Sequence, residues 1–543
     1  MDINNFSRET LSISEAVLSA SKENPGKTAL NFMGINISCK KLMKKTEALA
    51  FAFYSLGLRK GDAALIFLPN IPQAVYALYA LNRIGAVSAF ASPLSAEAEI
   101  ETYINKTKPK LVVALDTLCD KIKNVFAKTG DVKLVITSAL DELLPLNFRK
   151  KSDIIYWQNL YKIKQKGNIY LSPQKSSDTA VILFSGGTTG PPKAVELTNL
   201  NLNALAEGTK QACGTDVKGV SMLSVLPVFH GFGLGICIHT TLYFSGECIL
   251  VPRFDSIKTG RIIKRQKPQY IAAVPAMLTP LINSKTLAKA DLSRLKGVFS
   301  GGDSLKSELE DDFNNFLLKH NSQAKIRRGY GLTECVAASC LMPLNEYKKE
   351  SIGKPYPHTL YKIVRQNTTE EALENSEGEI CISGKTVMKG YLYDEAETKN
   401  VLKIHTDGKR WLHTGDMGYM DSEGFVYFTG RLKRMIISNG CNIYPSELEK
   451  ALLKHNCVKE CCAVGVKDPQ RAQCAVMFAV INPKSKVKEN ELTEHLRKHI
   501  SKQSMPGRIY PIDKIPKTPL GKTAYQKLVT MAETLIKAEN TAE

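Results

Sequence analysis

Residues 180–193 read AVILFSGGTTGPPK, an apolar run that passes directly into a loop of glycine, threonine and proline ending at Lys193. The short apolar run predicts a buried strand. In the loop, glycines let backbone N–H groups approach an anion, hydroxyl groups donate to phosphate oxygens, and the lysine adds positive charge. This composition favours a phosphate-binding loop over a surface turn. It is not a Walker loop, because Lys193 follows Pro192 and no serine or threonine comes after it.

Similar apolar runs recur along the chain and alternate with helix-like segments. They lie at residues 63–68, 110–114, 132–136, 270–274 and 297–300, and a stretch with helical spacing occupies 72–86. This alternation predicts parallel sheets that are covered by helices on both faces. From about residue 350, glycine-bounded runs at 378–384 and 424–430 predict an antiparallel β subdomain. Another α/β unit follows Gly430 and ends in a helix near 524–539.

The composition of the 543 residues is that of a globular protein, with 43% hydrophobic and 23% charged residues. No run of about 18 uncharged apolar residues predicts a membrane span, and the N-terminus does not resemble a secretory signal. Thirteen irregularly spaced cysteines are expected to be mostly core thiols in a reducing, cytoplasmic compartment. The net charge of +20 raises nucleic acid as a partner, but no basic module interleaved with aromatic residues supports it.

Three further segments carry side chains suited to acid or nucleotide binding. The stretch PVFHGFG at 227–233 combines aromatic, histidine and glycine residues that suit a gate beside an apolar cavity. In GYGLTE at 329–334, a tyrosine can stack on a purine, a threonine can hold an anionic oxygen and a glutamate can coordinate Mg²⁺. In HTGD at 413–416, the carboxylate can accept from two vicinal hydroxyls. Taken singly, each also fits a core histidine, a common turn or a surface charge.

Seven segments in order resemble the motifs of the adenylate-forming superfamily, which includes acyl-CoA synthetases, nonribosomal adenylation domains and firefly luciferase. The loop at 185–193 resembles the Ser-Gly-Thr-Thr-Gly-x-Pro-Lys signature, and 329–334 resembles the Tyr-Gly-x-Thr-Glu motif. The other matching segments are 227–233, 300–305, 413–416, 430–434 and 516–522. Three departures occur: Gly186 replaces a usual serine or threonine, Ala194 replaces a usual glycine, and the segment 467–473 lacks the Gly-Glu that relatives often have near its end.

The resemblance implies a role for each motif. The residues expected to bind ATP or the thiol arm are Ser185, Gly187, Thr188, Thr189, Gly190, Lys193, Gly302, Asp303, Tyr330, Gly331, Asp416, Arg431 and Gly440. The residues expected to take part in catalysis are Lys522, Thr333, Glu334 and His230, with Glu334 also the Mg²⁺ ligand. The intact Lys522, Glu334 and Asp416 argue against a catalytically inactive relative.

The resemblance also implies the domain organisation. We expect an N-terminal adenylation core at 1–432, built of parallel α/β sheets with a small β-barrel subdomain. A small, mobile α+β lid domain is expected at 433–543, with its hinge at Lys433. Residues 434–543 carry 18 basic and 11 acidic side chains, a net +7 that would attract ATP, coenzyme A, a carrier protein or an anionic membrane surface.

The implied reaction joins a carboxylic acid to AMP at the expense of ATP and passes the acyl group to coenzyme A. Phe229 is followed by His230 rather than aspartate, which disfavours an amino acid as substrate. The small residues at 336–339, with no tryptophan in that motif, predict a pocket longer than acetyl. We therefore expect a medium- or long-chain fatty acid. An aryl acid–CoA ligase and a ligase that loads an acyl carrier protein in trans are the alternatives.

Overall fold

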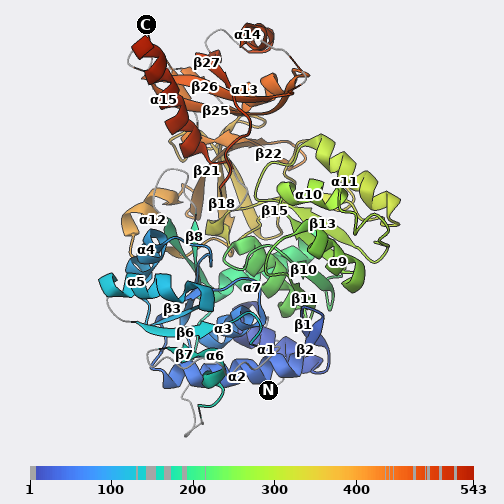
Figure 1. Ribbon diagram of the computed structural model, residues 1–543, viewed down its shortest axis with the longest axis vertical. Helices are drawn as coiled ribbons and strands as arrows, with labels where there is room; N and C mark the ends of the chain where they lie inside the picture. The colour runs from blue at the N-terminus through green and yellow to red at the C-terminus, as the bar shows by residue number, and fades with distance from the viewer. Residues whose placement is uncertain are drawn as a thin grey trace. The chain divides into compact units, whose positions relative to one another are not determined.

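The computed structural model describes residues 8–129, 132–141, 154–163, 173–185, 192–214, 216–434, 436–438, 441–443, 445–468, 472–483, 485, 489–500, 504–518 and 523–542. The chain divides into two compact units (Figure 1). The first comprises Met1–Ser185, Pro192–Tyr361 and Ile382–Leu412, and the second comprises Gly186–Pro191, Lys362–Cys381 and His413–Glu543. The domain boundary between residues 432 and 433 and the hinge at Lys433 remain predictions.

A nine-stranded sheet in the first unit has the order β16-β15-β14-β13-β12-β10-β11-β1-β2. Its central pairings, from β14 to β1, are parallel, whereas the edge strands β2, β15 and β16 pair antiparallel. The strands are β1 (Thr28–Phe32), β2 (Ile35–Ser38), β10 (Ser221–Ser224), β11 (Glu247–Leu250), β12 (Tyr270–Ala273), β13 (Gly297–Ser300), β14 (Ile326–Tyr330), β15 (Cys340–Leu341) and β16 (Lys354–Pro355).

An eight-stranded sheet, also in the first unit, has the order β19-β9-β8-β4-β3-β5-β6-β7. It is parallel from β8 to β7, and β9 and β19 add antiparallel. The strands are β3 (Ala63–Phe67), β4 (Val87–Phe90), β5 (Leu111–Leu115), β6 (Lys133–Thr137), β7 (Ile155–Tyr156), β8 (Thr179–Ser185), β9 (Lys193–Thr198) and β19 (Gly390–Tyr391). The predicted parallel α/β class is confirmed, and the predicted strands at 63–68, 110–114, 132–136 and 180–184 are all present.

Helices of the first unit cover these sheets. They are α1 (Ile13–Glu23), α2 (Cys39–Ser55), α3 (Pro72–Arg83), α4 (Glu97–Thr107), α5 (Cys119–Thr129), α6 (Trp157–Leu160), α7 (Asn199–Cys213), α8 (Thr241–Tyr243), α9 (Ser256–Gln266), α10 (Pro275–Ile282), α11 (Ser307–Lys319) and α12 (Glu395–Val401), with the short turns η2 (Arg8–Thr10) and η3 (Asp116–Leu118). The predicted helix at 72–86 is α3. All its residues from Pro72 to Asn82 are buried, so α3 is a central helix with no solvent-facing side.

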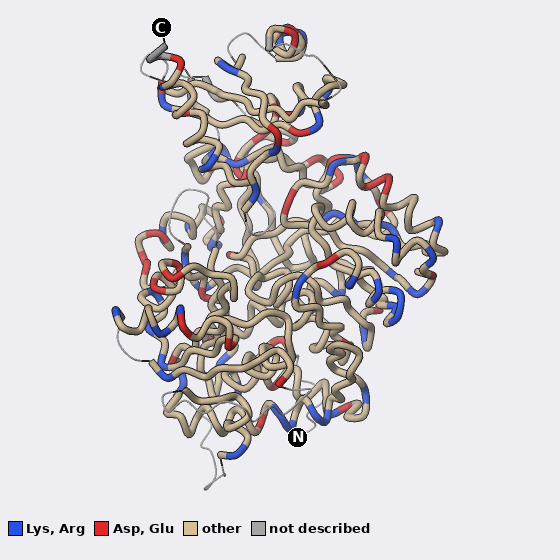
Figure 2. Tube along the Cα trace, viewed as in Figure 1, with Lys and Arg blue, Asp and Glu red and all other residues tan. Residues whose placement is uncertain are grey.

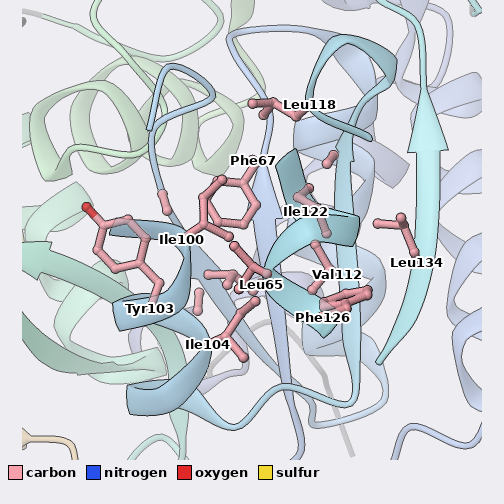
Figure 3. Close-up of a cluster of buried hydrophobic side chains, with 14 of the residues drawn as sticks. Leu65, Phe67, Ile100, Tyr103, Ile104, Val112, Leu118, Ile122, Phe126 and Leu134 are labelled. Carbon is pink, nitrogen blue, oxygen red and sulfur yellow. The ribbon is translucent and has the colours of Figure 1, made fainter. Parts of the chain in front are cut away.

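Buried apolar side chains hold α4 and α5 against the eight-stranded sheet (Figure 3). Ile100 and Ile104 of α4 lie one turn apart and share one helix face, as do Ile122 and Phe126 of α5. These side chains join Leu65 and other residues of the central strands in one buried cluster. Each fully buried side chain of this size contributes about 1.5–3 kcal/mol.

The remaining strands form two smaller sheets. The first has the order β17-β18-β21-β20 with β22 beside β21. Strand β21 pairs antiparallel with both β20 and β22, as the glycine-bounded runs predict. The second has the order β24-β23-β26-β25 with β27 beside β26. The strands are β17 (Thr359–Val364), β18 (Gly378–Gly384), β20 (Leu402–Ile404), β21 (Arg410–Met420), β22 (Val426–Arg431), β23 (Ile436–Ser438), β24 (Cys441–Ile443), β25 (Val458–Asp468), β26 (Ala472–Ile481) and β27 (Arg508–Pro511).

The C-terminal sheet is covered on both faces. Side chains of α13 (Pro445–Leu453) and α14 (Glu489–Arg497) pack with Met477 of β26, whereas α15 (Tyr525–Ala542) packs with Val476 and Phe478 on the opposite face. Alternation of side chains along the strand separates the two clusters. The predicted helix near 524–539 is confirmed as α15.

The charged residues and the cysteines are spread through the described chain. Lys and Arg recur along the described chain in both units (Figure 2), so the charge of +20 has no single location. The described cysteines are free thiols, and most of them are buried. Among the helices in the described part of the chain, none is long and apolar enough to cross a membrane.

A buried histidine stabilises the π-helical segment η4 (Phe232–Thr240). His239 Nε2 donates to Asn203 Oδ1 at 3.0 Å, and the hydroxyl of Tyr79 lies 3.3 Å from Nδ1. Asn203 is oriented by its amide N–H groups, which donate to backbone carbonyls that include that of Leu11. Complete burial lowers the pKa of His239 to about 3, so its neutral imidazole is a structural element.

The depressed pKa of His239 predicts a loss of stability in mild acid. The unfolded chain takes up this proton below about pH 6.5, whereas the folded chain does so only near pH 3. The neutral His239 therefore makes its full contribution to the free energy of unfolding above pH 6.5. Below that pH, the free energy of unfolding falls by about 1.4 kcal/mol per pH unit toward pH 3. In urea titrations, His239→Gln should unfold at lower urea but show a flatter pH dependence between pH 6.5 and 5. An unchanged slope would contradict this role.

Candidate active site

The nine-stranded sheet brings three of the sequence motifs to one edge. Residues 227–233 follow β10, residues 300–305 follow β13, and residues 329–334 include the end of β14. These strands belong to the parallel part of the sheet, so their carboxyl ends meet at the same edge, where open α/β sheets bind ligands. The fold therefore collects His230, Asp303 and Tyr330 along that edge.

Glycines allow the backbones of these motifs to touch. A Cβ atom on Gly231 would lie 1.4 Å from the carbonyl oxygen of Val336, and one on Gly331 would lie 1.6 Å from that of Ala337. A Cβ on Gly301 would lie 3.0 Å from the carbonyl oxygen of Gly329. No side chain fits in the first two positions, so the motif glycines are required for close approach between segments.

A strained turn follows directly after Glu334. Val336 has φ 65° and ψ −61°, and Ala337 N–H donates to the Cys335 carbonyl at 2.8 Å. Positive φ is a genuine outlier for a β-branched residue and persists only where packing enforces it. Here Val336 is fully buried, and its Cγ1 would lie 3.1 Å from a Cβ placed on Gly235 of η4. The sequence reveals only that residues 336–339 are small, so this turn is a feature that sequence reasoning missed.

Cys335 has no role as a nucleophile, although it lies beside Glu334. Its thiol is fully buried. Burial, reinforced by the negative charge of Glu334, raises its pKa well above the ordinary value. The residue therefore remains a neutral thiol that fills the core beneath the turn.

A buried ion pair joins strand β14 to helix α11, which follows the motif at 300–305. Arg328 Nε donates to Glu310 Oε2 at 2.7 Å, and Arg328 Nη2 donates to the Ser307 hydroxyl at 3.2 Å. Glu310 and Ser307 lie in the first turn of α11, which begins just after Gly302 and Asp303. Strand β14 is thus joined to the segment that carries another motif. In the sequence, the adjacent arginines resemble an ordinary surface charge run, so this contact was not predicted.

Of the residues predicted to bind phosphate in the loop at 185–193, the structure describes Ser185 and Lys193. They face each other at the ends of the antiparallel strands β8 and β9. Lys193 forms an ion pair with Glu397 and lies over the ring of Tyr391, whose hydroxyl donates to Glu334 Oε1 at 2.9 Å. Gly187, Thr188, Thr189 and Gly190 lie outside the described residues.

The second unit places Asp416 and Arg431 together. They are register partners on β21 and β22, and Arg431 Nε lies 3.1 Å from Asp416 Oδ1. The turn before Asp416 is fixed by Glu379, whose carboxylate accepts from Gly415 N–H at 2.8 Å and lies 2.7 Å from His413 Nδ1. Lys433 is in the short turn η6 (Leu432–Arg434), whereas Gly440 and Lys522 lie outside the described residues.

Other site candidates are partly accessible. His230 is half-buried, with its ring centroid 4.8 Å from that of Phe229. Thr333 and Glu334 are half-buried in the short turn η5 (Thr333–Cys335). Gly302 and Asp303 are exposed, and Gly302 has φ 81°. The edge therefore presents an imidazole, a hydroxyl and two carboxylates around closely packed glycine backbone.

Comparison with known proteins identifies this combination of fold and motifs. The family model for AMP-binding enzymes matches residues 18–392, and that for the C-terminal domain of AMP-binding enzymes matches residues 447–522. The chain belongs to the AMP-binding enzyme family. The predicted superfamily membership is therefore confirmed.

Full-length relatives agree with this assignment. The chain is 32% identical to a long-chain-fatty-acid–CoA ligase of Bacillus subtilis (strain 168), over 93% of this chain and 92% of that relative. It is 30% identical to a 4-coumarate–CoA ligase of Humulus lupulus, over 88% and 85% of the two chains. The fold matches that of ATP-bound MatB from Rhodopseudomonas palustris with a TM-score of 0.84 at 22% identity, over 96% and 99% of the two chains.

The reaction class follows from the family. This AMP-binding enzyme is an AMP-forming acid–CoA ligase, as the motifs predict. Its substrate is a carboxylic acid, and the relatives' names include both fatty and aryl acids.

Because the backbone at Gly231 touches the Val336 turn, we expect that one methyl group added at residue 231 lowers the activity sharply. In Gly231→Ala, the new Cβ must displace the Val336 carbonyl, which is backbone and cannot rotate away. We expect acid-dependent pyrophosphate release to fall at least about fivefold, because overpacking costs about 1–3 kcal/mol. Gly26→Ala is the matched control, since a Cβ there meets nothing within 4 Å. Equal activity of the two variants would contradict the close approach.

Proposed function

We propose that this ligase activates a medium- or long-chain fatty acid to an acyl-adenylate and then transfers the acyl group to coenzyme A. The observation that carries the proposal is the apolar packing in the segment that follows His230, where Gly235 of η4 lies against the buried side chains of Val336 and Leu205. The residues that follow Glu334 are small, which would leave room for an alkyl chain. The similarity to a long-chain-fatty-acid–CoA ligase along nearly the whole chain supports the same choice.

In the first half-reaction, a carboxylate oxygen of the acid attacks the α-phosphorus of ATP. The new bond joins the acid to AMP, while the bond to the β-phosphate breaks and pyrophosphate leaves. Positioning and neutralisation of charge dominate such phosphoryl chemistry. Thr188, Thr189 and Lys193 would hold the leaving phosphates, Lys522 would stabilise the charge on the α-phosphate, and Asp416 would accept the ribose hydroxyls.

Glu334 fits the role of a Mg²⁺ ligand. Its carboxylate is half-buried and, among the described residues, only its Oε1 accepts a hydrogen bond. The second oxygen can therefore act as the hard oxygen ligand that Mg²⁺ prefers. When bound, Mg²⁺ would offset the negative charge of the phosphates. Thr333, in the same turn, would hold an oxygen of the acid or of the α-phosphate.

In the second half-reaction, the thiol of coenzyme A attacks the acyl carbon. A carbon–sulfur bond forms, the bond to the phosphate oxygen breaks, and AMP leaves with the electron pair while the thiol proton passes to solvent. A rotation about Lys433 would remove Lys522 and bring Gly440 to the thiol arm. The basic C-terminal region would suit an acidic carrier protein as the thiol acceptor. It would also suit loading at an anionic membrane surface. Both proposals fit a cytoplasmic location.

An aryl acid is the second candidate. The similarity to 4-coumarate–CoA ligases, at 30% identity over 88% of this chain, favours it. Both candidates would use the same edge of the nine-stranded sheet and would differ in the acid that this edge accepts.

The acid preference tests the proposal. Pyrophosphate release should be measured with straight-chain acids from acetate to stearate and with benzoate and cinnamate, each with ATP, Mg²⁺ and coenzyme A. We expect kcat/KM to rise about fourfold per added methylene until the pocket is filled, because burying each methylene contributes about 0.8 kcal/mol. A reaction without acid is the control. A preference for cinnamate or benzoate would replace the fatty acid with an aryl acid, and a preference for acetate would contradict both.

A further inference from the structure

Tyr391 is fixed to the strand that begins at Lys193. In β19 it is the register partner of Val195 in β9, and the adjacent Leu392 N–H donates to the Ala194 carbonyl at 2.8 Å. Its own N–H donates to the Thr398 hydroxyl of α12 at 2.9 Å. The backbone of Tyr391 is therefore tied to the end of the phosphate-binding loop.

The same tyrosine reaches the predicted Mg²⁺ ligand. Its hydroxyl donates to Glu334 Oε1 at 2.9 Å, and Met388 N–H donates to the Glu334 carbonyl oxygen at 2.8 Å. Tyr391 is 7% exposed, so this hydrogen bond is sheltered from water. An ionised carboxylate oxygen can only accept, so the Tyr391 hydroxyl is the donor in this hydrogen bond.

The ring of Tyr391 contacts the predicted phosphate-binding cation. Lys193 Nζ lies 4.8 Å from the ring centroid, within the range of a cation–π interaction. The same ammonium group forms an ion pair with Glu397 in the first turn of α12. Both groups of this pair are less than one-third exposed. One aromatic side chain therefore contacts Lys193 with its face and Glu334 with its edge.

We propose that Tyr391 is a positioning residue that holds Lys193 and Glu334 in a fixed arrangement for MgATP. The proposal rests on the proposed function, in which Lys193 binds phosphate and Glu334 binds Mg²⁺. By donating to Oε1, the hydroxyl orients the carboxylate so that Oε2 is presented to the metal. The ring holds the lysine stem in place, and Glu397 is the counter-ion that the triphosphate replaces.

The hydroxyl and the ring can be tested separately. Binding of α,β-methylene-ATP, which cannot release pyrophosphate, should be measured by isothermal titration calorimetry with and without Mg²⁺. In Tyr391→Phe, the factor by which Mg²⁺ increases the nucleotide affinity should fall about tenfold, because a hydrogen bond to a charged group is lost. The affinity without Mg²⁺ should stay unchanged. In Tyr391→Leu, binding without Mg²⁺ should also weaken about threefold or more, because the cation–π contact is lost.

Two sets of variants keep the test specific. Tyr393→Phe is the matched control, because that phenol lies two residues further on and is 76% exposed. Its binding should equal that of the wild type. Glu334→Ala and Lys193→Ala report on the proposed function itself, and both should weaken binding of the Mg²⁺ complex.

The outcomes separate the two claims. If Tyr391→Phe responds to Mg²⁺ as the wild type does while Glu334→Ala does not, the positioning role is overturned and the proposed function stands. If Glu334→Ala and Lys193→Ala both bind like the wild type, the proposed roles of these residues fail. If Tyr391→Phe lowers the melting temperature and weakens acid and nucleotide binding equally, Tyr391 is merely structural.

Discussion

The close approach of backbone at Gly231 and Val336 is the constraint on which the rest of the site depends. Parallel strands bring the ends of β10, β13 and β14 to one edge of a sheet, but neighbouring loops normally remain separated by their side chains. Glycines at 231 and 331 remove that separation, and the carbonyls of Val336 and Ala337 occupy the space. The positive φ of Val336 is the cost of this contact.

Paired polar groups hold other parts of the predicted site in place. Arg328 and Glu310 join β14 to α11, and their side chains are 10% and 2% exposed. A buried pair of this kind is weak evidence for stability, but it fixes geometry because either charge alone would be costly. Tyr391 contacts Lys193 with its aromatic ring and donates its hydroxyl hydrogen bond to Glu334, which is the basis of the positioning role proposed for it.

The sequence predicted the framework well, because local patterns determine it. The apolar runs at 63–68 and 180–184 and the helix at 72–86 follow from residue type and spacing alone, and the ordered motifs identified the family. The contacts that were missed join residues far apart in the chain: Tyr391 and Glu334 are 57 positions apart, and Lys193 and Glu397 are 204 apart. Neither Tyr391 nor Arg328 stands out by its neighbours. The basic charge of +20 was likewise uninformative about partners.

The central claim is that the acid is activated by attack on the α-phosphorus of ATP. The most direct measurement uses a fatty acid labelled with ¹⁸O in its carboxylate, with ATP, Mg²⁺ and coenzyme A, followed by mass spectrometry of the products. Attack on the α-phosphorus predicts AMP that carries one labelled oxygen, with unlabelled pyrophosphate. Label in inorganic phosphate, with ADP as the nucleotide product, would contradict adenylate formation.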